Sequence, residues 1–209
     1  GGNAVDAAVA ACAVLCVVEP ESTGIGGDCF CLYAPAGSGK VIAMNGSGHA
    51  PAAATADWYR ERGITAIPDM TPHCVTVPGA IDAWSRLVAD HGRKGLDELL
   101  QPAIRYAEDG FVVHGRVALD WAGEAAKMRK DESAARLFGT PLAEGERFVQ
   151  KELGRTLRMV AEGGRDAFYT GEIAEDIVGY LRSKGGLYTL DDFAAQQAEY
   201  VEPIRTDYR

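Results

Sequence analysis

The stretch GGNAVDAAVAACAVLCVVEPESTGIGGDCFCLYAP, residues 1–35, decides the fold because it predicts a long helix followed by a strand. Asn3 precedes an Ala-rich apolar run and has Asp6 three residues after it, a pairing that caps helix starts. Apolar residues then cover every face, so we expect a fully buried helix that ends at Glu19-Pro20. Asp6 and a run shorter than about 20 residues argue against a membrane span.

A hairpin and a helical segment follow. CFCLYAP is strand-like, AGSG at 36–39 predicts the hairpin loop, and KVIAM predicts the returning strand. From Pro78 onward, apolar residues recur at helical spacing between short polar connections. Pro102 is expected to open a helix, and Gly92 and Gly163 to end others. The residues expected to cap helix starts are Thr170 and the pair Thr189 and Asp192.

These segments predict an α+β fold. Residues 1–60 form a helix plus a strand hairpin, residues 78–195 are mainly helical, and residues 198–209 begin a further strand.

Composition and short motifs exclude several classes of function. A formal charge of -9 argues against a nucleic-acid partner. Five cysteines without a C-x-x-C pair predict free thiols, and four histidines without metal-ligand spacing predict no metal site. No G-x-S-x-G motif supports a serine hydrolase. STGIGGD at 22–28 precedes a strand and fails the dinucleotide and Walker patterns, so a plain turn is favoured over a ligand-binding loop, and no cofactor is expected.

Longer motifs, taken in order, resemble the gamma-glutamyltranspeptidase family of N-terminal nucleophile hydrolases. The motifs are residues 1–30, Ala50-Pro51 with the Ala/Thr run after it, VTVPGAIDAW at 75–84, LLQPAIRYAEDGFVV at 99–113, and the segments 145–178 and 185–209. The resemblance covers essentially the whole chain.

The resemblance implies that the chain is part of the large subunit of a longer precursor. Residues 1–209 would be a partial large-subunit region of a single domain, part of a four-layer αββα sandwich. The family's precursor cuts itself, and the nucleophile is the new N-terminal Thr of the small subunit, beyond Arg209. No catalytic residue is therefore expected in this chain. The implied partners are the small catalytic subunit and a small-molecule amide substrate, and neither nucleic acid nor a membrane is expected.

The resemblance also implies a substrate-binding turn in NGSGHAP, residues 45–51. In transpeptidase members, the turn before Ala-Pro carries an Arg that pairs with the α-carboxylate of the glutamyl group. Matching Ala50-Pro51 to that motif places Ser47 at the Arg position and Gly48 where an acid is usual. The predicted substrate-binding residues are Asn45, Ser47, Gly48 and, as a wall residue, His49.

Three functions remain open at this stage. The leading hypothesis is an amidase or acyltransferase that acts on an acyl group other than gamma-glutamyl. The alternatives are a true gamma-glutamyl hydrolase or transpeptidase, which would use another cation, and a non-catalytic scaffold. The odd number of thiols favours a cytoplasmic location, with a periplasmic or secreted one as the alternative.

Overall fold

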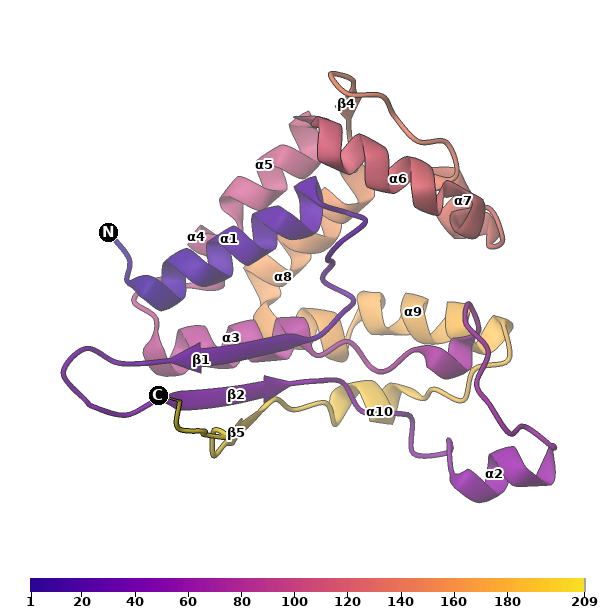
Figure 1. The fold of residues 1–209 in the computed structure, drawn as a ribbon, viewed down its shortest axis with the longest axis horizontal. Coiled ribbons are helices and arrows are strands. Elements are labelled where there is room, and N and C mark those ends of the chain that lie inside the picture. Colours follow the sequence, from indigo (N-terminus) through magenta and orange to yellow (C-terminus); the bar gives the residue numbers. More distant parts are fainter. Residues whose placement is uncertain (209) are drawn as a thin grey trace. The chain divides into compact units, whose positions relative to one another are not determined.

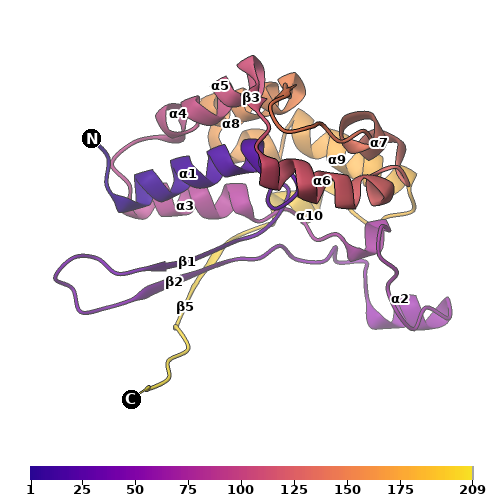
Figure 2. The same ribbon diagram turned by 45° about the horizontal axis from the view of Figure 1, so that its top comes forward.

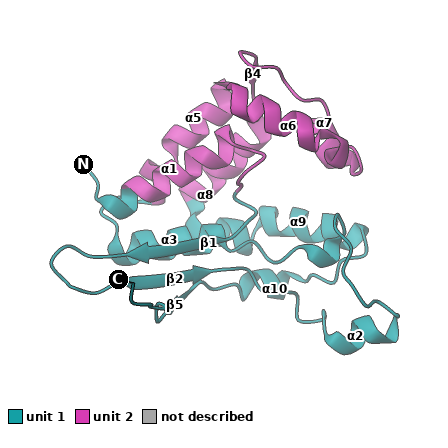
Figure 3. Cartoon of the chain, in the orientation of Figure 1, with its two compact units in different colours: residues 1–6, 25–95, 163–209 teal, residues 7–24, 96–162 magenta. Residues whose placement is uncertain are grey.

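The computed structural model describes residues 1–208, which form two compact units of mixed helix and sheet (Figure 3). Unit 1 comprises residues 1–6, 25–95 and 163–209, and unit 2 comprises residues 7–24 and 96–162. Unit 1 contains β1 (Cys29–Tyr33), β2 (Ile42–Gly46), α2 (Ala56–Glu61), the 3-10 turn η1 (Pro72–Cys74), α3 (Ala80–His91), α9 (Glu172–Ser183), α10 (Leu190–Ala194) and β5 (Glu199–Val201).

Unit 2 is built mainly of helices. It contains α4 (Leu96–Leu99), α5 (Gln101–Asp109), β3 (Phe111–Val112), α6 (Gly115–Met128), α7 (Glu132–Phe138) and β4 (Arg147–Phe148). Two helices, α1 (Ala4–Val18) and α8 (Lys151–Tyr169), have residues in both units. Pro102 lies in the first turn of α5, as predicted, because the missing N–H of proline costs nothing at that position.

The three-stranded sheet of unit 1 has the order β1-β2-β5 and is antiparallel (Figure 1). The predicted hairpin is confirmed, with Cys29 opposite Gly46 and Tyr33 opposite Ile42. One face of the sheet packs on α3, which runs along it in both views (Figure 2). On the other face, Phe30 and Leu32 are 70% and 73% exposed. The sheet therefore buries one face and leaves an apolar face open.

The start of α1 is held by the predicted capping pair. Asn3 Oδ1 accepts hydrogen bonds from the N–H groups of Val5 and Asp6 at 3.0 and 3.1 Å. Asp6 in turn accepts from the Asn3 N–H at 2.6 Å and from the Arg93 N–H at 3.0 Å, just beyond α3. Burial alone would raise the pKa of Asp6, but these backbone donors and Lys94 lower it below its usual value.

The expectation that α1 is buried on every face is wrong for this chain. Val9, Ala13 and Val17 are buried, whereas Ala7 is exposed and Leu15 is 44% exposed. Small alanine side chains make the helix look uniformly apolar in sequence without requiring burial. Among the described residues, no helix has the length and apolar character needed to cross a membrane.

The boundary between α8 and α9 differs from the prediction in one respect. Gly164 interrupts α8 with φ 63° and ψ -152°, next to the stop expected at Gly163. Thr170, however, does not cap α9, whose N-cap is Gly171. The Thr170 hydroxyl donates to Asp166 O at 2.8 Å, so this side chain is already used by the last turn of α8. The capping box of Thr189 and Asp192 at the start of α10 is confirmed.

Candidate functional site

The turn at residues 45–49, which carries the predicted substrate-binding residues, begins in the last residues of β2. Asn45 lies opposite Phe30 on β1 and Glu199 on β5, which places it on the open face of the sheet. Its side-chain oxygen accepts the Ser47 N–H at 3.0 Å, the bond that defines an Asx turn. The chain therefore leaves the sheet in a conformation set by Asn45 itself.

The turn lies directly on the segment that leads into α3. A Cβ atom added at Gly48 would lie 1.6 Å from Val77 O, and one added at Gly79 would lie 2.1 Å from Gly46 O. His49 O also accepts the Val77 N–H at 2.9 Å. Gly48 is therefore required for close backbone packing. Whether it also contacts substrate stays a prediction.

Gln196 holds the other side of the turn. This residue is only 1% exposed. Its amide oxygen accepts from the His49 N–H at 3.2 Å and lies 3.1 Å from His49 Nδ1, and its amide nitrogen donates to Ser47 O at 3.2 Å. Because an amide oxygen only accepts, the hydrogen on the His49 ring lies on Nδ1. Gln196 thus fixes both the backbone at Ser47 and His49 and the orientation of the imidazole.

A buried ion pair supports the segment that carries Gln196. Arg165 donates to a carboxylate oxygen of Asp82 and to the backbone carbonyls of Ala194 and Gln196. Asp82 also accepts the Ala198 N–H at 2.5 Å. The ion pair therefore also forms hydrogen bonds with the backbone before, at and after Gln196.

Tyr169, at the end of α8, extends this support to the segment beneath the turn. Its hydroxyl donates to Pro78 O at 2.7 Å and accepts the Asp82 N–H at 3.1 Å. Burial raises the pKa of Tyr169 well above its usual range. The hydroxyl therefore keeps its hydrogen for Pro78.

Asp28 provides the charged contact of the turn. Asp28 Oδ1 accepts the Gly48 N–H at 2.9 Å, and Oδ2 lies 3.4 Å from Ser47 Oγ. Asp28 is exposed, whereas Ser47 and Gly48 are half-buried. A carboxylate therefore lies beside the position at which the resemblance expects an Arg.

Asp28 and Gln196 were both missed by the sequence reasoning. Asp28 ends the STGIGGD loop, where the glycines drew attention and the carboxylate did not. In the structure, Gly27 O accepts the N–H groups of Gly79 and Ala80 at 3.0 Å, so the loop binds the start of α3. Gln196 follows α10 without any local motif. Its contacts are with residues about 150 positions earlier, which no local pattern can indicate.

A small cavity of about 110 Å³ adjoins the turn on the side of Ala50 and Pro51. Tyr59, His73 and Tyr188 contribute to its wall. The His73 ring packs edge-on against Tyr59, with the ring centroids 5.5 Å apart. Over residues 1–208, no group of three or more His, Cys, Asp or Glu side chains is placed to hold a metal ion.

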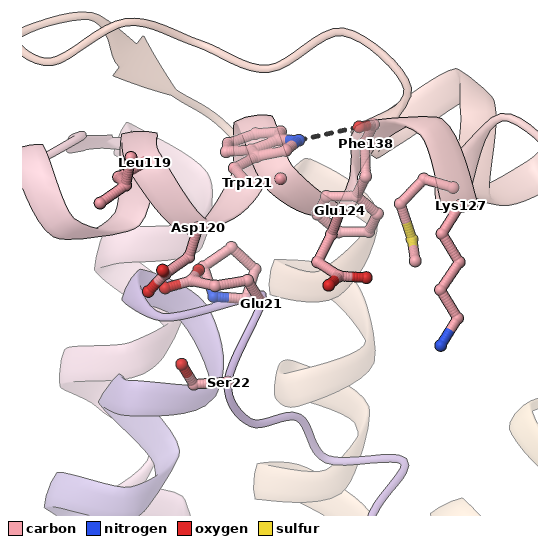
Figure 4. A pocket seen from close by; sticks show the side chains of 11 residues that line it. Glu21, Ser22, Leu119, Asp120, Trp121, Glu124, Lys127 and Phe138 are labelled. Carbon is pink, nitrogen blue, oxygen red and sulfur yellow. Dashed lines mark hydrogen bonds between the residues drawn. The ribbon is translucent and has the colours of Figure 1, made fainter.

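A larger cavity of about 570 Å³ lies within unit 2, between the Pro20–Ser22 segment and helices α6 and α7 (Figure 4). Trp121 and Phe138 form part of its wall, and Trp121 Nε1 donates to Phe138 O at 2.8 Å. Burial raises the pKa of Glu21, and the neighbouring carboxylates of Glu19 and Asp120 raise it further. The residues predicted to bind substrate lie in unit 1, so this cavity contains none of them.

Comparison with known proteins places the whole chain in one family. A family profile described as Gamma-glutamyltranspeptidase matches residues 1–209. The chain is 40% identical over 213 residues to the "Glutathione hydrolase-like YwrD proenzyme" of Bacillus subtilis (strain 168), covering 100% of the chain and 40% of that protein.

Solved structures agree with this match. The crystal structure of cephalosporin acylase from Bacillus halodurans is 37% identical, with a TM-score of 0.93 over 100% of this chain and 40% of the other. Helicobacter pylori gamma-glutamyltranspeptidase is 31% identical, with a TM-score of 0.93 over 100% of this chain and 62% of that chain. The predicted fold class is confirmed, and the chain spans about two fifths of the length of the "YwrD" protein. By sequence and by fold, the chain belongs to the gamma-glutamyltranspeptidase family.

Proposed function

We propose that the chain is part of the large subunit of an autoprocessed amide hydrolase or acyltransferase that acts on an acyl group other than gamma-glutamyl. The observation that carries this proposal is the pair Ser47 and Asp28. The family resemblance places Ser47 where transpeptidase members hold a carboxylate-binding Arg, and Asp28 Oδ2 lies 3.4 Å from the Ser47 hydroxyl.

The energetic consequence of this exchange is large. Removing one member of a buried bidentate charge pair costs about 2 to 5 kcal/mol, and each 1.4 kcal/mol is roughly tenfold in affinity. A hydroxyl beside a carboxylate supplies neither the charge nor the paired donors that a glutamyl α-carboxylate requires. The related proteins named above include both a glutathione hydrolase-like protein and an acylase, so the family accommodates more than one acyl group.

The catalytic step would belong to the part of the protein beyond residue 209. An N-terminal Thr would attack the amide carbonyl with its own α-amine as the base, and water or an amine would then release the acyl group. The described residues would position the acyl end through the turn at 45–49. The open apolar face around Phe30 and Leu32 would pack against the sheet of the small subunit.

Kinetics on the complete, processed protein test the proposal. The substrates are a gamma-glutamyl anilide, a glutaryl amide, oxamate and a butyryl amide, which carries no carboxylate, compared by kcat/KM. We expect at least one of the other acyl groups to exceed gamma-glutamyl. Robust turnover of the gamma-glutamyl substrate alone would overturn the proposal in favour of a true gamma-glutamyl hydrolase or transpeptidase.

Sequencing the N-terminus of the second fragment after processing tests the remaining alternative. A Thr at that N-terminus is expected of both enzymes. An unprocessed chain, or a fragment that begins with another residue, would indicate a non-catalytic scaffold.

A further inference from the structure

We infer that the turn at residues 45–49 presents negative charge and no free N–H group of Ser47, Gly48 or His49 to the substrate, so that it selects an acyl end without a carboxylate. This inference rests on the proposed function, because it assumes that the turn contacts the acyl group. It goes further by specifying the chemical class of that group: an end that is neutral or that donates hydrogen bonds, such as an ammonium.

The first observation concerns the backbone donors of the turn. Three successive N–H groups are already bonded to side chains of the same unit: Ser47 N–H to Asn45 Oδ1 at 3.0 Å, Gly48 N–H to Asp28 Oδ1 at 2.9 Å, and His49 N–H to Gln196 Oε1 at 3.2 Å. Free backbone N–H groups are what make turns and loops bind anions. The last three N–H groups of this turn are bonded internally, so none of them is available to a carboxylate.

The second observation concerns the side chains that remain. Asp28 is exposed and is held at the turn by its bond to Gly48, so its charge stays beside Ser47. The Ser47 hydroxyl donates its hydrogen toward Asp28 Oδ2, so the lone pairs of Ser47 Oγ can accept from another donor. His49 directs Nδ1 to Gln196 Oε1, so a ring with a single hydrogen carries it on Nδ1 and has Nε2 as an acceptor. Apart from the Asn45 amide nitrogen, which is a donor, these groups are therefore complementary to donors.

The third observation concerns how the arrangement is maintained. Gln196 is 1% exposed, and Gly48 packs against Val77 O without room for a side chain. The turn cannot rotate its N–H groups outward without breaking buried contacts. The acceptor character therefore follows from the fold of unit 1 and not from a loop that can rearrange around an anion.

Four matched anilides separate the carboxylate of the acyl group from its amine. Gamma-glutamyl carries both groups, glutaryl only the carboxylate, 4-aminobutyryl only the amine, and butyryl neither. In the complete processed protein, we expect kcat/KM to be higher for the two substrates without a carboxylate. Replacing Asp28→Asn keeps an oxygen acceptor for Gly48 and removes the charge. It should raise kcat/KM for the carboxylate pair about tenfold relative to butyryl, the scale of a like-charge contact near a protein surface.

The matched control is Asp57→Asn, an exposed carboxylate on α2 that pairs with Arg60 at 2.7 Å. This control substitution should not change the ratio of kcat/KM between any two of the four substrates. In the unmodified protein, higher ionic strength should also narrow the gap between the two substrate pairs, whereas the Asp28→Asn protein should show a smaller salt effect.

A double-mutant cycle sharpens the test. Ser47→Arg alone would place a guanidinium within reach of Asp28, which would hold it as an ion pair. We expect only a small gain on glutaryl and gamma-glutamyl anilides. Combining Ser47→Arg with Asp28→Asn frees the guanidinium from the ion pair. For the glutaryl and gamma-glutamyl anilides, the gain in kcat/KM should then exceed the product of the two single gains.

Different outcomes overturn the inference and the proposed function. If the unmodified protein prefers gamma-glutamyl over the other three anilides, the proposed function fails. The other case is that the unmodified protein prefers another of the four anilides, while Asp28→Asn and higher ionic strength change kcat/KM equally for all four or not at all. In that case the proposed function stands and the inference about the turn fails.

Discussion

Gln196 shows how one buried amide can determine the geometry of a candidate binding turn. It contacts the backbone on both sides of Gly48 and orients the His49 ring. Its neighbour Gln197 is exposed. The two glutamines are adjacent in sequence and chemically identical, but only Gln196 is buried. Gln197 is therefore a suitable control for substitutions at Gln196.

Replacing Gln196→Met should leave the His49 N–H and the Ser47 carbonyl without their partner. We expect a loss of stability of about 1 to 3 kcal/mol, the cost of unpaired buried polar groups, together with a higher KM. Thermal melts and steady-state kinetics on the complete protein check this, with Gln197→Met as the control. A Gln196→Met protein that melts and binds like the control would contradict the assignment.

Glu21 is the residue whose environment predicts a pH-dependent stability. Within the described residues, neither of its carboxylate oxygens has a hydrogen-bond partner, and Figure 4 shows Asp120 beside it. Burial, then Glu19 and Asp120, raises its pKa. A raised pKa means that the folded protein holds the proton more tightly than the unfolded chain. The stabilisation is complete below the ordinary glutamate pKa and is lost as the pH rises through the folded value.

Replacing Glu21→Gln should therefore raise the melting temperature at neutral pH by about 2 °C and have little effect near about pH 4. Glu61, an exposed residue on α2, provides the control substitution Glu61→Gln, for which no such pH dependence is expected. A Glu21→Gln protein that is less stable at neutral pH would show that the carboxylate has a favourable partner in the complete protein.

At the scale of elements, the pair Asp82 and Arg165 joins α3, the end of α8 and the segment before β5. The Asp82 side chain is 7% exposed and the Arg165 side chain 25%. In unit 2, Arg158 and Glu108 make a bidentate pair at 2.6 Å, with side-chain exposures of 48% and 31%. The two pairs have similar geometry and differ in burial.

Burial predicts unequal costs for breaking these pairs. Arg165→Met leaves a buried carboxylate and should cost about 3 kcal/mol, whereas Arg158→Met should cost much less because water replaces the lost contact. Melting temperatures of the two variants of the complete protein measure the difference. Equal shifts would mean that burial does not govern the strength of the Asp82 pair.

At the scale of the molecule, the open face of the β1-β2-β5 sheet is the surface on which the proposed small subunit would pack. Phe30 and Leu32 are 70% and 73% exposed on one face of β1, and large exposed apolar patches mark interaction surfaces. Replacing Phe30→Glu together with Leu32→Lys should prevent processing or separate the two subunits during size-exclusion chromatography. Leu119→Lys changes a residue that is 66% exposed on α6 and should leave assembly intact. Assembly of both variants alike would exclude this face as the interface.

Much of the fold could be predicted because its signals are local. Asn3 and Asp6 cap α1, the AGSG loop joins β1 to β2, and Thr189 and Asp192 cap α10 through residues a few positions apart. Thr170 was assigned to the wrong helix because a hydroxyl between two helices can serve either one. The organisation of residues 1–209 as a single domain stays a prediction.

The candidate site could be placed by sequence only as far as its chain segment. The motif around Ala50-Pro51 locates the turn and identifies Ser47, since the order of motifs resembles the family. Whether Asn45, Ser47, Gly48 and His49 bind substrate stays a prediction.

The sequence by itself determined the family, the helices with clear caps, the hairpin and the position of the turn. Only the tertiary structure decided the chemistry of that turn, because Asp28 and Gln196 reach it from 20 and about 150 residues away. Their side chains bond the backbone N–H groups that an anion would need. Such long-range pairing depends on which elements pack together, and no local pattern in the sequence encodes it.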